Sequence, residues 1–144
     1  MKSYHTLALL AALSFGTCKK DQGTIPHSLA GKWRMAEVTD LLTNTSTQKP
    51  LSVKGDVDIR FSFANPTAGG LDGVTPTNDL QADFSTTTNN DLGISNLAYS
   101  KVMETSWGAL FLDNIRSSHD YSIDAFHRLN INTSNSKRLI FIPQ

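Results

Sequence analysis

Residues 56–63 constrain the fold more than any other segment, because apolar and polar side chains alternate strictly along them. The apolar positions are Val57, Ile59, Phe61 and Phe63, and the polar positions between them are Asp58, Arg60 and Ser62. A period of two residues is typical of a β-strand with one buried face and one face in water. The segment therefore predicts a sheet that is packed on one side only.

Most of the remaining chain also favours strands and turns. Ser, Thr and Asn are abundant while only two Glu occur, a balance that suits strands better than helices. We expect further strands over residues 32–42, 80–84, 92–97 (irregular near Asn96), 121–123, 129–131 and 139–142. Short connections at 124–128 and 133–137 join the last three, which predicts a C-terminal antiparallel meander.

The spacing of the apolar residues changes once, from that of a strand to that of an amphipathic helix. Met103, Trp107, Leu110, Phe111 and Ile115 share one helical stripe. Gly108 within this helix costs about 1 kcal/mol relative to alanine, so packing rather than propensity must hold the helix. The chain is thus expected to be mainly β, with a single helix before the meander.

The N-terminal segment is typical of an export signal. Lys2 precedes an apolar run, residues 7–13, which is followed by small residues and by Cys18, the sole cysteine. The run is far shorter than the ~20 residues that span a bilayer. It resembles the signal peptide of bacterial lipoproteins, although Thr17 departs from their usual small residue. The resemblance implies lipidation at Cys18 and a place in the cell envelope, anchored at the outer membrane.

The resulting organisation has three parts. Residues 1–17 are the signal peptide, 18–28 a flexible leader from the lipidated cysteine, and 29–144 one domain. Without Lys2 the chain has 12 basic and 13 acidic residues and no basic run, which argues against a nucleic-acid partner. Since lipid occupies the only cysteine, no thiol remains for a disulfide, a zinc site or a nucleophile. We expect a monomer without cofactor or metal.

Several short motifs in order resemble the META/HslJ-like family. They are Leu29-x-Gly31-x-Trp33, residues 73–78, the helix with Trp107, Tyr121-x-Ile123, Leu129-x-Ile131 and Leu139-x-Phe141, and the resemblance extends from Leu29 to Pro143. It implies a small antiparallel β-barrel with one helix, often exported or lipid-anchored, linked to envelope stress and without catalytic residues. The family's Gly-Cys-Asn element is altered here, because Thr77 stands before Asn78. A redox or metal role for that element is therefore excluded, while Asn78 can still matter structurally.

Gly31-x-Trp33 also resembles the opening of the lipocalins, whose barrels carry apolar ligands. The bulky alternating residues of the predicted strands would instead fill a narrow barrel. We therefore expect a packed core and a lipocalin-like topology. A lipocalin-like carrier of a small apolar molecule is the alternative function.

Residues 65–78 read as a long loop, since they include Pro66, Pro76, Gly69-Gly70 and Asp72-Gly73. Long loops in compact domains are often functional. Leu71 and Val74 are apolar residues that a solvated loop does not need. Together with Asn78 they form the predicted interaction loop, the alternative being a lid over the barrel end.

No catalytic or metal motif stands out. His119 and Asp120 lack a third ligand, and Asp56 with Asp58 lacks the spacing of a calcium loop. Ser118-His119-Asp120 has the residue types of a triad, but triads are assembled across elements rather than from neighbours. We expect a non-enzymatic, envelope-anchored module with an interaction or stress role.

Overall fold

The computed structural model describes residues 28–144, and these form a nearly closed antiparallel β-barrel with one helix. The strands are β1 (Gly31–Asp40), β2 (Thr45–Gln48), β3 (Asp58–Asn65), β4 (Ala68–Val74), β5 (Asp79–Thr86), β6 (Leu92–Tyr99), β7 (Ser118–Ile123), β8 (Leu129–Thr133) and β9 (Lys137–Pro143), with α1 at Ser106–Ile115. The mainly β fold predicted from the sequence is confirmed.

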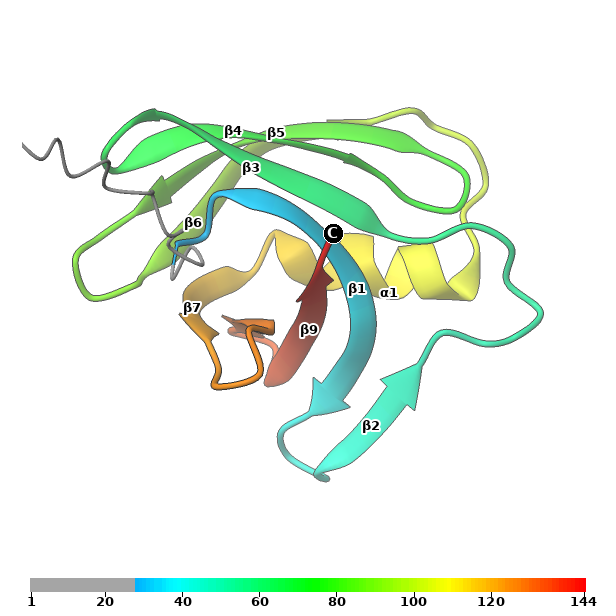
Figure 1. Cartoon of the computed structure of the whole chain (residues 1–144). Coiled ribbons are helices and arrows are strands. Elements are labelled where there is room, and N and C mark those ends of the chain that lie inside the picture. The colour runs from blue at the N-terminus through cyan, green and yellow to red at the C-terminus, as the bar shows by residue number, and fades with distance from the viewer. Residues whose placement is uncertain (1–27) are drawn as a thin grey trace, which may run out of the picture.

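The order of the strands around the sheet is β6-β5-β4-β3-β1-β9-β8-β7, and β2 pairs with β1 beside this path. β6 and β7 meet at the seam, where a bridge joins Asp91 to Asp120 and the Tyr121 amide donates to the Asn90 carbonyl at 3.0 Å. In Figure 1, β3, β4 and β5 form the upper wall, β1 curves around the front and α1 lies beneath that wall. The predicted meander is β7-β8-β9.

Side chains from all sides fill the barrel. Phe61, Phe111 and Phe141 are at most 1 % exposed, and the Phe111 and Phe141 rings meet edge to face with centroids 6.3 Å apart. The buried core is Leu29, Trp33, Met35, Val38, Val57, Ile59, Phe61, Leu71, Leu80, Ala82, Phe84, Leu92, Trp107, Phe111, Leu112, Ile115, Leu129, Ile131, Leu139 and Phe141. The packed interior expected for a small barrel is thus present.

The helix follows the predicted stripe with one exception. Trp107, Phe111 and Ile115 are buried against the barrel. Met103 is 91 % exposed, because the helix begins only at Ser106, and its inclusion in the stripe was wrong. Thr105 caps the helix through its side-chain oxygen, which accepts from the Gly108 amide at 3.1 Å.

The irregularity expected near Asn96 is a bulge in β6. Asn96 has a φ of 51°, and the register between β5 and β6 shifts where Gln81 pairs with Ala98 but Asp83 with Ser95. An extra residue on one strand produces this shift and bends the strand. Here the bend carries β6 around the barrel wall.

Two segments without a strand pattern in the sequence contain strands. The polar segment 43–50 includes β2, all of whose residues are exposed. Residues 65–78 were expected to be a long loop, but β4 occupies 68–74 and pairs with β3 and β5 over its whole length. The loop interpretation is therefore wrong.

Candidate functional site

The outer faces of β1, β3 and β4 present a small grid of charged residues. Lys32 lies opposite Arg60, which lies opposite Asp72, and in the next row Arg34, Asp58 and Val74 are aligned in the same way. Trp33 and Ile59, between them in sequence, are buried. Alternation along paired strands therefore turns these six side chains away from the core.

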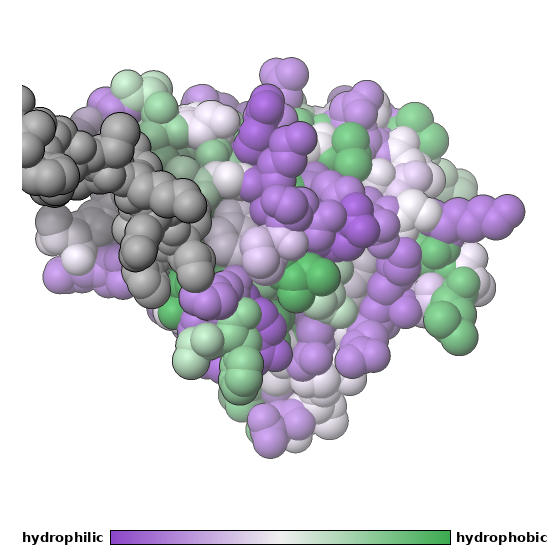
Figure 2. Space-filling model, in the orientation of Figure 1, coloured by the Kyte–Doolittle hydropathy of each residue, from purple (hydrophilic) through white to green (hydrophobic). Residues whose placement is uncertain are grey.

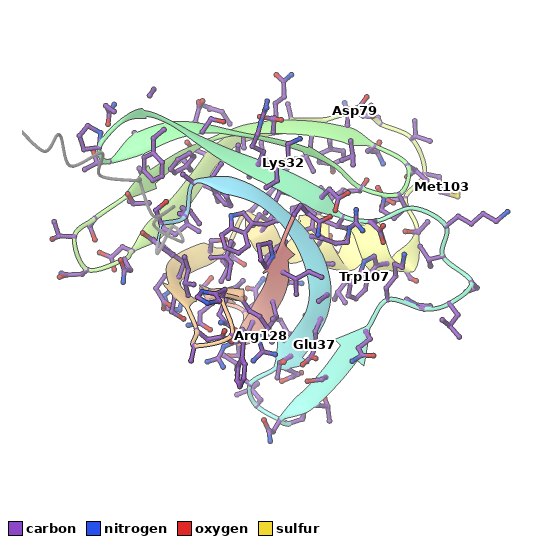
Figure 3. The ribbon with its side chains drawn as sticks, viewed as in Figure 1. Lys32, Glu37, Asp79, Met103, Trp107 and Arg128 are labelled. Atoms are coloured by element: carbon purple, nitrogen blue, oxygen red, sulfur yellow. The ribbon has the colours of Figure 1, made fainter. Side chains whose placement is uncertain are left out.

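These residues line a cleft of about 450 Å³ on the barrel surface. Its lining is Lys32, Arg34, Asp58, Ile59, Arg60, Asp72, Gly73, Val74 and Gln144. Figure 3 shows Lys32 on the viewer's side of the sheet, and Figure 2 shows hydrophilic side chains gathered over the same region. The cleft thus brings five charged side chains together, three basic and two acidic.

Arg34 is held firmly at one side of the cleft. Its Nε and Nη2 donate to the two carboxylate oxygens of Asp58 at 2.8 and 3.0 Å, and Asp56 lies 3.5 Å from Nε. The hydrogen bond to Asp58 raises the pKa of Arg34 above its usual value; burial opposes this rise, while the negative charges of Asp58 and Asp56 add to it. Asp56 also pairs with Lys49 at 2.5 Å. Both carboxylates considered for calcium therefore have basic partners.

Arg60 is held more loosely. Its Nε and Nη2 both contact one oxygen of Asp72, at 3.1 and 3.0 Å, and the two side chains are 51 % and 46 % exposed. Lys32 is exposed and makes no ion pair with any residue from 28 to 144. The cleft therefore offers one unpaired ammonium group beside a solvent-accessible guanidinium.

This arrangement is suited to ionic recognition. The lining residues, all in the described part of the chain, include no Ser, Thr, Cys, His or Tyr that could act as a nucleophile or proton shuttle. Lys, Arg and Asp side chains at a rim bind charged groups and orient them. The cleft can therefore bind and orient charged groups.

The three residues of the predicted interaction loop do not act together. Leu71 is 1 % exposed in β4 and packs in the core, so it cannot meet a partner, and this assignment was wrong. Val74 is 41 % exposed and lines the charged cleft. Asn78 is 3 % exposed and lies in the turn between β4 and β5.

The glycines of β4 explain why it resembled a loop. A Cβ on Gly69 would lie 2.0 Å from the Ser62 carbonyl oxygen, and one on Gly73 would lie 2.3 Å from that of Asp58. These glycines therefore allow close approach of β3 rather than a turn. The rings of Phe63 and Phe84 flank Gly69 in register and meet edge to face with centroids 4.9 Å apart.

Asn78 is the centre of a buried hydrogen-bond network that the sequence only partly indicated. Its Nδ2 donates to the Val102 carbonyl at 3.1 Å and to Glu104 Oε2 at 2.8 Å, and its Oδ1 accepts from the Val102 amide at 2.9 Å. Its backbone amide donates to Thr75 Oγ1 at 3.0 Å. The amide thus ties the β4–β5 turn to the segment that leads into α1.

Glu104 completes this network, which we call the helix clasp: Thr75, Asn78, Glu104 and Thr105. The Thr75 hydroxyl donates to Glu104 Oε2, and the Thr105 amide donates to Oε1 at 2.8 Å. Burial raises the pKa of Glu104, but hydrogen bonds from Thr75, Asn78, the Thr105 backbone and Thr77 outweigh it, so the pKa lies below its ordinary value.

Sequence reasoning missed Glu104, although Gly108 was a signal for it. A Cβ on Gly108 would lie 2.3 Å from the Glu104 carboxyl carbon and Oε1. Glycine is needed in the first turns of α1 because the Glu104 carboxylate occupies the space that a side chain would take. A glycine inside a helix, four residues after a Glu, is consistent with such packing.

The other polar candidates are dispersed. His119 Nδ1 pairs with its neighbour Asp120 at 2.7 Å, while the Ser118 hydroxyl donates to the Ile115 carbonyl at 2.6 Å. Within residues 28–144, no three His, Cys, Asp or Glu side chains are grouped so that they could hold a metal ion. In the same part of the chain, no helix is long and apolar enough to cross a membrane. Cys18, the predicted lipidation site, lies outside the described residues.

Comparison with known proteins identifies a fold but no family. No family model matches the chain, and no curated protein matches it significantly in sequence. A protein from Burkholderia xenovorans, solved by NMR, is similar in structure with a TM-score of 0.59 and 13 % identity, over 79 % of this chain and 81 % of that one. A DUF4847 family protein from Bacteroides vulgatus has a TM-score of 0.57 and 12 % identity, over 80 % of this chain and 94 % of that one. At these identities the likeness extends to the fold alone.

Proposed function

We propose that this protein is a non-enzymatic binding module of the cell envelope that contacts a protein partner through the charged cleft. The observation that carries the proposal is the filled interior of the barrel. Phe61, Phe111 and Phe141 occupy the space that a ligand-carrying barrel would leave open. Binding then uses the outer surface, where the cleft brings five charged side chains together.

The anchor is the second part of the proposal. The apolar run before Cys18 supports a lipid tether at that residue, in the outer membrane, with the barrel displayed as a monomer on a short leader. A tethered module meets its partners at high local concentration, so weak ionic contacts suffice. A role in envelope stress fits a module that binds but does not catalyse.

Membership of the META/HslJ-like family is also part of the proposal. It is supported by the single helix α1 placed before the three strands β7, β8 and β9. Asn78, the Asn of the altered element, contributes hydrogen bonds to the helix clasp. The alternative, a carrier of apolar ligands, needs a lumen, and no observation favours it.

Crosslinking in intact cells tests the proposed contact. Lys32→Glu combined with Arg60→Glu reverses two charges in the cleft. Lys54→Glu combined with Lys101→Glu is the matched control, because both lysines are exposed and lie outside the cleft lining. The control variant changes the net charge by the same amount as the cleft variant. We expect the first variant to lose its crosslinked partner and the control to retain it, with both melting like the wild type. An unchanged crosslinking pattern in the cleft variant would rule the proposal out.

A further inference from the structure

The charged grid contains one mismatched position. Arg60 faces Asp72 and Arg34 faces Asp58, so two of the cross-strand pairs are complementary. Lys32 and Arg60, however, are also direct register partners on β1 and β3. Like charges directly opposite each other in an antiparallel pair are destabilising. Arg60 has Asp72 as its counter-ion, whereas Lys32 pairs with no carboxylate side chain of residues 28–144.

The donors at this pair are available to a ligand. The printed sequence places no carboxylate beside Lys32 in β1, and its ammonium group pairs with none of the residues from 28 to 144. Nε and Nη2 of Arg60 both contact a single oxygen of Asp72, while Nη1 of Arg60 makes no hydrogen bond with residues 28–144. Both groups border one cleft. An anion between them would accept hydrogen bonds from both cations and relieve their repulsion.

We propose that Lys32 and Arg60 bind a carboxylate, which the protein partner carries into the cleft. This inference rests on the proposed function and names the chemistry of the contact. Arg34 takes no part, because Asp58 already satisfies its guanidinium in a bidentate manner.

The carboxylates of the cleft favour a ligand with a single negative charge. The lining includes three basic side chains, Lys32, Arg34 and Arg60, and two acidic side chains, Asp58 and Asp72. A carboxylate can lie between Lys32 and Arg60, whereas a polyanion places further charge against Asp58 and Asp72. Val74, 41 % exposed in the same cleft, offers apolar contact to the part of the ligand next to the anion.

Titration with small anions tests this site. The probes are sodium acetate, dimethyl phosphate and tripolyphosphate, added at constant ionic strength to the full chain with Cys18→Ala and followed by amide chemical shifts. We expect acetate to shift the amides around residues 31–33 and 59–61, with a dissociation constant of roughly millimolar size. Tighter binding of dimethyl phosphate than of acetate would point to a phosphodiester and overturn the inference.

Neutral variants give the control. Lys32→Gln and Arg60→Gln should each weaken binding about tenfold, as loss of a charge-assisted hydrogen bond does, while Lys54→Gln should leave it unchanged. Equal affinities in Lys32→Gln and Lys54→Gln, or tighter binding of tripolyphosphate than of both monoanions, would overturn the inference. If the anions bind as expected but crosslinking in cells is unaffected by the cleft variant, the proposed function fails and the anion site stands. If crosslinking depends on the cleft and no anion binds, the anion site fails alone.

Discussion

At the scale of single residues, Asn78 has the most consequential side chain outside the apolar core. It is 3 % exposed and bonds with both its Nδ2 and its Oδ1 to the segment before α1. Asn78→Ala removes these bonds and leaves the Val102 amide and carbonyl without their side-chain partner. We expect a loss of about 2–3 kcal/mol of unfolding free energy, measured by urea denaturation. Asn89→Ala, at an exposed turn position, is the control and should change stability little.

Glu104 gives the clasp a dependence on pH. Burial raises its pKa, but the hydrogen bonds donated to it lower the pKa further, so the net value in the folded state is below the ordinary 4.5. The stability that it supplies is therefore complete above the ordinary carboxyl pKa and is lost as the pH falls through the lowered folded pKa.

The corresponding prediction compares the wild type with Glu104→Gln. Asp40, Asp56 and Asp124 also have lowered pKa values and titrate in both proteins, so the difference between the two curves isolates Glu104. Thermal midpoints measured from about pH 7 to pH 2 should fall less steeply in Glu104→Gln below about pH 4.5. Parallel curves would show that the Glu104 carboxylate does not stabilise the fold.

At the scale of elements, α1 depends on a glycine that helix propensity disfavours. Alanine at position 108 would gain about 1 kcal/mol of helix propensity. Its Cβ would, however, lie 2.3 Å from the Glu104 carboxylate, which the clasp holds in place. Gly108→Ala should thus destabilise the wild type but stabilise a Glu104→Ala background by about 1 kcal/mol. A double-mutant cycle by chemical denaturation measures this, and the same sign in both backgrounds would contradict it.

The elements also show how far the sequence leads. β3 and β5 were predictable because Ile59, Phe61, Leu80 and Phe84 repeat with the period of a strand that has one buried face. β4 was not predictable from the sequence, because glycines are typical both of turns and of strands whose backbone lies close to a neighbour. Only the position of β3 in the structure distinguishes these two roles. β2 is polar and exposed throughout, so no burial pattern indicates it.

The charged cleft was missed for a related reason. The cleft residues Lys32, Arg60 and Asp72 are solvent-facing residues of three separate segments. They are aligned only by the register of β1, β3 and β4. Asn78 could be singled out from a motif, but its partners Val102 and Glu104 are 24 and 26 residues away, which no local pattern reveals.

At the scale of the whole molecule, the proposed attachment to the membrane rests on Cys18, because the apolar run before it in the sequence is shorter than the ~20 residues that span a bilayer. We expect Cys18→Ala to release the protein from the membrane fraction, and mass spectrometry of the wild type to find two or three acyl chains on this residue. Membrane fractions that retain Cys18→Ala in full, or a mature N-terminus at another residue, would contradict the prediction.

The pairing of β1 with β9 has a consequence for how the protein is made. The first strand is in register with the last, from Trp33 opposite Pro143 to Asp40 opposite Lys137, and β9 is also the partner of β8. Contacts between residues so distant in sequence slow folding, because a large loop must close before they form. During synthesis from the N-terminus, β1 emerges early but cannot pair with β9 until that strand is also free. The barrel can therefore close only after β9 has left the ribosome.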